Sequence, residues 1–218
     1  MEDAVRAIVA AGHPTLRGVL QQACRDAGAT VIAATETAAD TIDACRTESP
    51  SLLVLDLELP DSDGFRVLSS LEDGDRPGTV LVLSDRADGD RVLRALGLGA
   101  RAYVTKAEGL RGLPDTIRRA LSGERVIAPA LEQDAVLALG RMARRAREGE
   151  EVAAELTGRE RQVLQLLTDG RTMRQIGTRL GISPRTVETH VAKVYRKLGV
   201  RTRVQAVSKA ATLGLVEL

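Results

Sequence analysis

Three polar residues that could act together each follow a buried strand pattern in the first half of the chain. They are Asp56, Ser84 and Lys106. Because ligands of parallel sheets bind at the carboxyl ends of the strands, we expect the three side chains to converge at one rim. The chemistry predicted there is either ligand binding or a fixed polar network. In the network, Asp56 pairs with Lys106 beside a hydrogen-bonded Ser84, and the partner charge lowers the pKa of the carboxylate.

A second polar set lies on the helical pattern over residues 184–198. Two short helices joined by Gly181, Ile182 and Ser183 have the length and turn chemistry of a helix-turn-helix, whose second helix lies in the DNA major groove. The exposed face of that second helix would carry base-edge readers near its amino end and phosphate contacts further along. This face shows Arg185, Glu188, Thr189, Ala192, Lys193, Arg196 and Lys197.

The first 121 residues alternate short apolar runs with amphipathic stretches. The apolar runs predict strands over residues 7–10, 30–34, 52–55, 80–83 and 102–104. The amphipathic stretches predict helices near residues 15–27, 37–47, 64–71, 88–98 and 109–121. Five strand-helix units predict an α/β domain with a five-stranded parallel sheet covered on both faces.

The last segment, residues 156–218, is helical throughout in pattern. Thr157 and Glu160 form a capping-box signature, and Ser183 followed by Pro184 marks another helix start. We also expect Glu160 to take part in an ion pair within the domain. The predicted all-α domain has four helices, over residues 158–169, 173–180, 184–198 and 203–213.

Residues 122–155 predict a linker that holds one helix between domains at 1–121 and 156–218. The face of that helix is apolar and carries Leu131, Ala135, Ala138 and Met142. A basic run over residues 141–147 is followed at once by acidic residues. This pattern favours a solvated linker face over a DNA contact.

Charge separates the two ends of the chain. Residues 1–122 carry 14 Lys and Arg against 19 Asp and Glu, a net −5, whereas residues 151–218 carry 12 against 6, a net +6. A basic terminal block is typical of a protein that binds the DNA backbone. The scarcity of aromatic residues argues against single-stranded nucleic acid as the main ligand.

Composition also limits cofactors and location. Cys24 and Cys45 are the only cysteines, and we expect both to be buried, reduced thiols with no metal site around them. No signal-peptide pattern and no apolar run long enough to span a bilayer occur. We therefore predict a soluble, cytoplasmic protein that makes no membrane contact.

The C-terminal motifs are similar to those of a known family. LTGRERQVL over residues 156–164, TVETH over 186–190 and KLGV over 197–200 resemble the LuxR/NarL-type DNA-binding domain, over roughly residues 155–215. Met173 and Gly177 are mild departures, where the family often has Asn and Ala. The resemblance implies that Glu188, Thr189 and Lys193 lie near base edges. The full set expected at the double-stranded DNA is Arg174, Ser183, Arg185, Thr186, Glu188, Thr189, His190, Lys193, Arg196 and Lys197.

Within that set, Arg185 and Thr186 fit phosphate anchors better than base readers, and His190 fits either a phosphate contact or packing against a neighbour. The family resemblance also implies that the last helix carries a dimer contact, to which we assign Val204, Val207 and Ala211. We therefore expect a homodimer.

The front half resembles a response-regulator receiver domain, with a flavodoxin-like fold, over residues 5–121. LLVLDLELP over residues 52–60 followed by Asp63 and Gly64 carries the likeness. The resemblance assigns Asp56 to the phospho-acceptor position and Lys106 to the phosphate-binding lysine. It further assigns Ser84 and Tyr103 to the switch positions.

One part of the receiver pattern is missing. Where the family has two acidic residues before His-Pro, this chain has Ala11 and Gly12. Those acids would hold the Mg²⁺ that neutralises a transferring phosphoryl group. Asp56 beside Lys106 is a poor divalent-ion site, and although Glu58 or Asp85 could supply a displaced ligand, the strand direction disfavours Glu58. We expect no cofactor and, in particular, no Mg²⁺.

Several functions fit these patterns. The first is a sequence-specific, homodimeric transcription regulator whose atypical receiver responds to dimerisation, a small-molecule ligand or a partner protein. The second is a conventional two-component regulator phosphorylated on Asp56 by a histidine kinase. The third is an interaction module that has lost DNA binding. A small enzyme is disfavoured because the chain lacks a phosphate-cradling glycine loop, a nucleophile with a base and a paired-carboxylate site.

Overall fold

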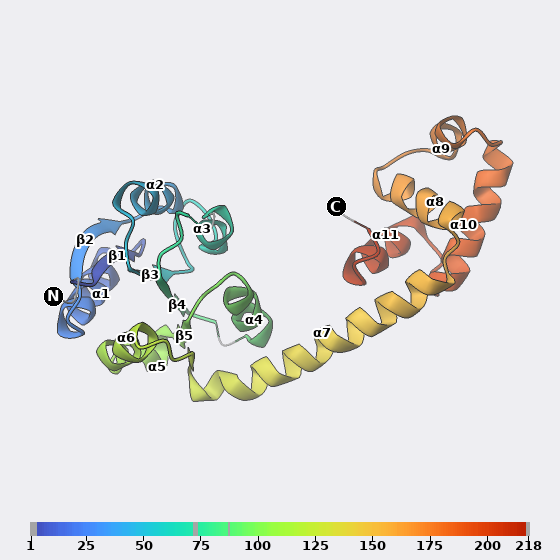
Figure 1. Cartoon of the computed structure of the whole chain (residues 1–218). Coiled ribbons are helices and arrows are strands. Elements are labelled where there is room, and N and C mark those ends of the chain that lie inside the picture. The colour runs from blue at the N-terminus through green and yellow to red at the C-terminus, as the bar shows by residue number, and fades with distance from the viewer. Residues whose placement is uncertain (1–3, 72–73, 87, 217–218) are drawn as a thin grey trace. The chain divides into compact units, whose positions relative to one another are not determined.

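The computed structural model describes residues 4–71, 74–86 and 88–216, and the chain forms two compact units (Figure 1). The first unit ends at Leu139 and the second begins at Gly140. The division therefore falls inside the segment predicted as a linker, residues 122–155. No helix in the described ranges is long and apolar enough to cross a membrane.

The first unit is built on a parallel sheet with strand order β2-β1-β3-β4-β5-β6. The five predicted strands are present, but the predicted count was one too low because Val126 and Ile127 pair with β5. A two-residue strand is too short to show the alternation from which strands are recognised. The strands are β1 Arg6–Ala10, β2 Thr30–Thr35, β3 Leu52–Asp56, β4 Thr79–Ser84, β5 Ala102–Thr105 and β6 Val126–Ile127.

Helices cover both faces of this sheet, as predicted (Figure 1). Alternate strand residues point to opposite sides, so Ile8 and Leu53 pack with α2, α3 and α4, whereas Val9 and Val54 pack with α1 and α6. The helices are α1 Pro14–Asp26, α2 Ala38–Glu48, α3 Phe65–Ser70, α4 Gly89–Gly97, α5 Lys106–Gly109 and α6 Leu113–Leu121.

The predicted thiols are confirmed as buried. Cys24 on α1 and Cys45 on α2 are free cysteines inside the two cores. Burial raises the pKa of Cys24 to about 11 and that of Cys45 to about 12. Neither thiol is reactive at neutral pH, because the thiolate is the nucleophilic form.

Helix α7, Pro129–Glu155, contributes residues to both units. Leu131 and Ala135 complete the core on the α2–α4 side of the sheet, and Ala138 is also buried, as the helical periodicity predicted. Met142 follows on the same helical face but is 51% exposed. Leu131 and Ala135 are buried because they pack on the core of the first unit. Met142 lies beyond the last residue of that unit, Leu139.

The second unit contains the four predicted helices, α8 Gly158–Thr168, α9 Met173–Leu180, α10 Pro184–Leu198 and α11 Arg203–Thr212. The predicted capping box is present, since Thr157 and Glu160 each accept from the other's backbone N–H. Gly181 ends α9 and Gly199 ends α10 in the left-handed conformation that favours glycine. These signals fix the helix boundaries that set α10 against α8 and α9.

Gly149 on α7 marks a close backbone approach to α11. It is buried, and a Cβ there would collide with the carbonyl oxygen of Leu213. We expect Gly149→Ala to lower the free energy of unfolding by about 1–3 kcal/mol, because backbone cannot yield as a side chain can. Gly140→Ala is the matched control on the same helix, since its Cβ meets nothing within 4 Å and it should stabilise by up to about 1 kcal/mol. Urea unfolding checks both, and equal effects would contradict the close approach.

Candidate functional site

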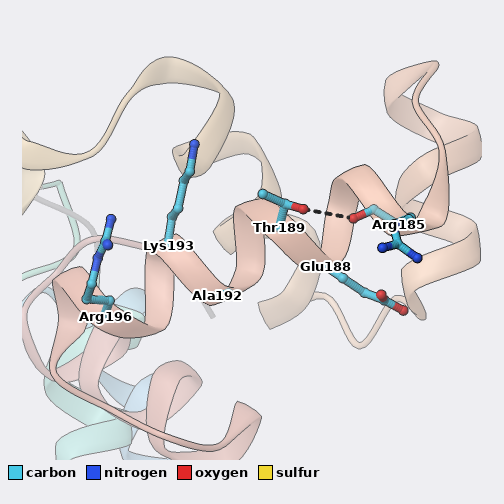
Figure 2. A pocket seen from close by; sticks show the side chains of 6 residues that line it. All are labelled: Arg185, Glu188, Thr189, Ala192, Lys193 and Arg196. Carbon is cyan, nitrogen blue, oxygen red and sulfur yellow. Dashed lines mark hydrogen bonds between the residues drawn. The ribbon is translucent and has the colours of Figure 1, made fainter.

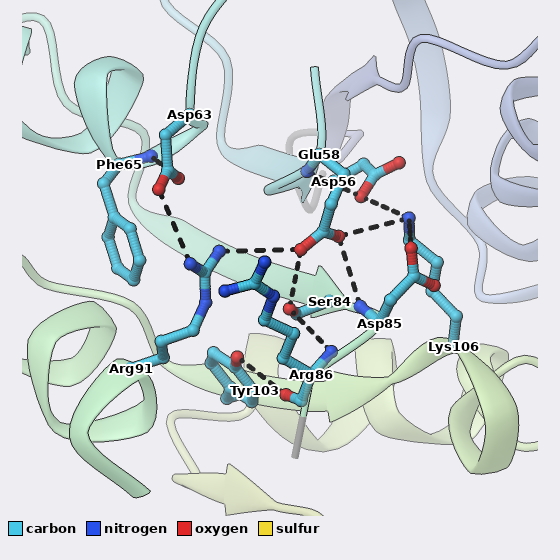
Figure 3. Close-up of polar contacts among 10 residues, drawn as sticks. All are labelled: Asp56, Glu58, Asp63, Phe65, Ser84, Asp85, Arg86, Arg91, Tyr103 and Lys106. Atoms are coloured by element: carbon cyan, nitrogen blue, oxygen red, sulfur yellow. Dashed lines mark hydrogen bonds and ion pairs between the residues drawn. The ribbon is translucent and has the colours of Figure 1, made fainter. Parts of the chain in front are cut away.

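The structure brings the predicted rim residues of the first unit together (Figure 3). Asp56 is the last residue of β3, Ser84 is the last of β4, and Lys106 follows β5 directly. Asp56 is 2% exposed, and its Oδ1 lies 2.8 Å from Lys106 Nζ. The predicted Asp56–Lys106 pair is therefore confirmed.

Glu58 also belongs to this rim, which corrects the expectation drawn from its strand direction. Its Oε1 accepts a hydrogen bond from the Ser84 hydroxyl at 2.9 Å. Its Oε2 accepts from the Asp85 N–H at 3.2 Å and lies 3.2 Å from Lys106 Nζ. The strand ends at Asp56, and Glu58 forms an isolated bridge with Asp63, so the alternation of the strand no longer fixes its direction. We call Asp56, Glu58, Ser84, Asp85 and Lys106 the rim site.

Charge and burial oppose each other in the rim site. Burial raises the pKa of Asp56 to about 6. The Lys106 ammonium does lower this pKa, as expected of a partner charge, and so does the Glu58 N–H, but burial outweighs both. For Glu58, burial also raises the pKa, but hydrogen bonds led by the one from Ser84 outweigh it and the net shift is downward. Glu58 is therefore the more firmly ionised of these two carboxyl groups.

Tyr103 connects to the rim site through one loop. Its side chain is fully buried in the core, and its hydroxyl donates to the Arg86 carbonyl oxygen at 3.3 Å. The Arg86 N–H in turn donates to Ser84 Oγ at 3.1 Å. The two predicted switch positions, Ser84 and Tyr103, thus lie on one hydrogen-bonded path.

The loop after β1 does not offer a metal site. Ala11 is fully buried, and a Cβ on Gly12 would lie 2.9 Å from Cδ of the Pro60 ring. Arg17 Nη1 donates hydrogen bonds to the carbonyl oxygens of Ala11 and Gly12, at 2.5 and 3.4 Å. Over the described ranges no cluster of three or more metal-ligating side chains occurs. These residues do not fit Mg²⁺, which prefers carboxylates and water to a loop already bound by a guanidinium.

In the second unit, the exposed face of α10 gathers five of the ten predicted DNA-contacting residues (Figure 2). The Thr189 hydroxyl donates to the Arg185 carbonyl oxygen at 3.1 Å. The face carries three cationic side chains and one carboxylate, a balance that favours a polyanion. We call this face the recognition surface; the residues lining its pocket are Arg185, Glu188, Thr189, Ala192, Lys193 and Arg196.

The predicted residues at the start of α10 have structural roles as well. Ser183 Oγ accepts from the Thr186 N–H at 3.1 Å and caps the helix, and the two hydroxyl oxygens lie 2.8 Å apart. His190 is half-buried, and its Nδ1 has no hydrogen-bond partner within the part of the chain that the structure describes. Their DNA contacts stay predictions.

Helix α9 presents a further basic surface. Predicted Arg174 lines a pocket there with Arg171 and Arg179, and all three are exposed. The last two were not predicted, although their spacing around α9 is visible in the sequence. The first helix of a helix-turn-helix crosses the DNA backbone, so these guanidinium groups are suited to phosphate contacts.

Lys197 differs from the rest of the predicted DNA set because the fold already uses its charge. Its Nζ lies 2.7 Å from Glu160 Oε2 and donates to the Glu155 carbonyl oxygen at 2.7 Å. The predicted intradomain ion pair of Glu160 is thus confirmed, with Lys197 as its partner. The hydrogen bond from Lys197, with those from Thr157, lowers the pKa of Glu160 to about 2.

The residues predicted for a dimer contact lie on helix α11. Val204 is 79% exposed, whereas Val207 and Ala211 are half-buried. Val204 also lines a surface pocket with Gln205 and Ser208. An exposed valine rimmed by polar groups is suited to contact a second molecule.

The two units together define a class of protein: a receiver-type α/β domain joined to a helix-turn-helix domain. Residues 7–118 match the family model described as response regulator receiver domain, and residues 154–210 match that of bacterial regulatory proteins, luxR family. The chain therefore belongs to the response regulators of the NarL/LuxR type and is a DNA-binding response regulator.

Known proteins similar to the chain are regulators, in agreement with the prediction that it is not an enzyme. It is 29% identical to the probable transcriptional regulatory protein NarL of Mycobacterium tuberculosis, over 99% of this chain and 97% of that one. It is 32% identical to the nitrate/nitrite response regulator protein NarL of Escherichia coli, over 89% of each. The fold is also that of promoter-bound RcsB from Salmonella enterica serovar Typhimurium, with a TM-score of 0.56, 17% identity, and coverage of 97% of this chain and 100% of that one.

Proposed function

We propose that the chain is a sequence-specific transcription regulator that binds double-stranded DNA as a homodimer, and that Mg²⁺-dependent phosphorylation of Asp56 does not control it. The observation that carries the second part is the closed loop after β1. Gly12 abuts Pro60, and the Arg17 guanidinium donates hydrogen bonds to the carbonyl oxygens of Ala11 and Gly12. No carboxylate pair therefore faces Asp56 from this loop. Asp56 itself is paired with Lys106.

The recognition surface supports sequence-specific binding. Glu188 and Thr189, nearer the amino end of α10, are proposed to read base edges. Arg196 and the ammonium of Lys193, which the family resemblance also puts near base edges, are proposed to contact phosphates. Val204, Val207 and Ala211 on α11 are proposed to join two copies. A two-fold dimer would then bind two half-sites about one helical turn of DNA apart.

The conventional alternative, phosphorylation of Asp56 by a histidine kinase, has its own support. It is supported by the convergence of Asp56, Ser84 and Lys106 at one rim and by the hydrogen-bonded path from Ser84 through Arg86 to the buried Tyr103. What separates the two proposals is metal-assisted transfer to Asp56. In the proposed function a small-molecule ligand, a partner protein or dimerisation sets the output in place of the phosphoryl group.

The test is incubation of the full chain with acetyl phosphate and Mg²⁺, followed by intact-mass measurement. We expect no adduct, and we expect Asp56→Asn to bind selected duplex DNA as tightly as the parent. A stable adduct that maps to Asp56 would overturn phosphorylation independence. DNA affinity is measured in parallel over a range of salt, because an interaction module without DNA binding would show no steep salt dependence.

A further inference from the structure

The carboxylate of Glu58 is held by three donors from two segments of the chain, residues 84–85 and Lys106. The Ser84 hydroxyl ends β4, the Asp85 N–H begins the following loop, and the Lys106 ammonium follows β5, at 2.9, 3.2 and 3.2 Å (Figure 3). A hydroxyl, a backbone N–H and an ammonium group that converge on one point are suited to bind an oxyanion. We propose that these donors form an oxyanion site beside Asp56 and that the Glu58 carboxylate fills it, closing the site to phosphate.

The balance of charge around Lys106 supports the proposal that carboxylates already occupy the oxyanion site. Lys106 Nζ lies within 3.2 Å of carboxylate oxygens from Asp56, Glu58 and Asp85. Arg91 adds a second cation 3.5 Å from Glu58 Oε1 but is shared with another carboxylate, that of Asp63. A phosphate would add negative charge where carboxylates already outnumber cations, so the parent site should repel it.

Chain connectivity gives Glu58 an advantage over any free anion. Its backbone N–H donates to Asp56 Oδ1 at 3.1 Å, which fixes the main chain two residues beyond the strand. The carboxylate is therefore delivered to the donors without loss of translational freedom. A free oxyanion must compete with an occupant whose effective concentration is high.

Glu58 in the oxyanion site also stabilises the hydrogen-bonded path from Ser84 to Tyr103. Ser84 donates to Glu58 and accepts from the Arg86 N–H, and the Arg86 carbonyl accepts from the buried Tyr103 hydroxyl. Glu58 thereby holds both switch positions in one arrangement with no added group. This inference rests on the proposed function, since it explains how the rim can be set without a phosphoryl group on Asp56.

The experiment is a titration of the full chain with inorganic phosphate at fixed ionic strength and without Mg²⁺, followed through the Asp85 amide signal by NMR. We expect Glu58→Ala to bind phosphate with an apparent Kd lower than that of the parent by about tenfold or more, because charge-assisted donors are freed. Glu58→Gln keeps the size of the side chain but not its charge, and it should lie between them. Adding Lys106→Ala to Glu58→Ala should remove the gain.

Glu48→Ala is the matched control, because it removes a carboxylate from the same unit that pairs with Arg6 and not with the rim site. It should leave phosphate binding as in the parent. The proposal is overturned if the parent binds phosphate as tightly as Glu58→Ala, or if both folded Glu58 variants show no gain. An Asp56 adduct in the acetyl phosphate test would instead overturn the proposed function. The titration with inorganic phosphate involves no phosphoryl transfer, so failure of this inference can be told apart from failure of the proposed function.

Discussion

Lys193→Ala is expected to weaken binding to duplexes selected by the parent by about tenfold and to lower the slope of log affinity against log salt by about one. Lys193 is exposed near the middle of the recognition surface and has no carboxylate partner among the ion pairs of the described residues. Its charge is free to displace a counterion from a phosphate. Binding measured at several salt concentrations gives both quantities.

The matched control is Lys209→Ala, because Lys209 lies on α11 and pairs with Glu148 at 2.9 Å. It should leave the salt slope unchanged. Glu188→Ala should act differently, changing the preference among sequences more than the affinity, since a carboxylate attracts no phosphate but can accept from a cytosine amino group. If Lys193→Ala and Glu188→Ala bind every duplex as the parent does, the assignment of α10 as the recognition helix is wrong.

The second unit was predictable because its signals are local. The cap at Thr157, the cap at Ser183 and the stops at Gly181 and Gly199 are each readable within a few residues, and the structure confirms them. Even here, two further capping boxes, which begin at Thr172 and Thr202, were not predicted. A glutamine at their third position satisfies the same backbone N–H as a glutamate does.

The rim site shows where sequence reasoning stops. The convergence of Asp56, Ser84 and Lys106 follows from strand order alone, and the structure confirms it. The orientation of the Glu58 side chain does not follow from strand order, because it depends on a bridge to Asp63 outside the regular sheet. The raised pKa of Asp56 likewise depends on the degree of burial, which a motif does not give.

The second large effect is expected in stability. Glu160→Ala should lower the free energy of unfolding of the second unit by about 2–4 kcal/mol, because it leaves Lys197 without its carboxylate and removes half of a capping box. Glu160 is 3% exposed, and its Oε2 accepts from the Thr157 N–H at 2.8 Å besides pairing with Lys197. Urea unfolding with a probe in the second unit measures the change.

The same pair predicts a pH dependence. The pKa of Glu160 falls from its ordinary 4.5 to about 2 on folding, so the folded state favours the ionised form. Its contribution to stability is therefore complete above pH 4.5 and is lost as the pH falls towards 2. Glu160→Gln keeps the size of the side chain but removes the titrating group, so its stability should change less than that of the parent across this window.

Glu151→Gln is the control for this pH dependence, because Glu151 is exposed on α7 in the same unit. It should retain the loss of stability of the parent at low pH. If Glu160→Gln loses stability between pH 4.5 and 2 as steeply as the parent, the ionised Glu160–Lys197 pair does not stabilise the fold. Lys197 would then be available to contact DNA, the role predicted for it from the sequence.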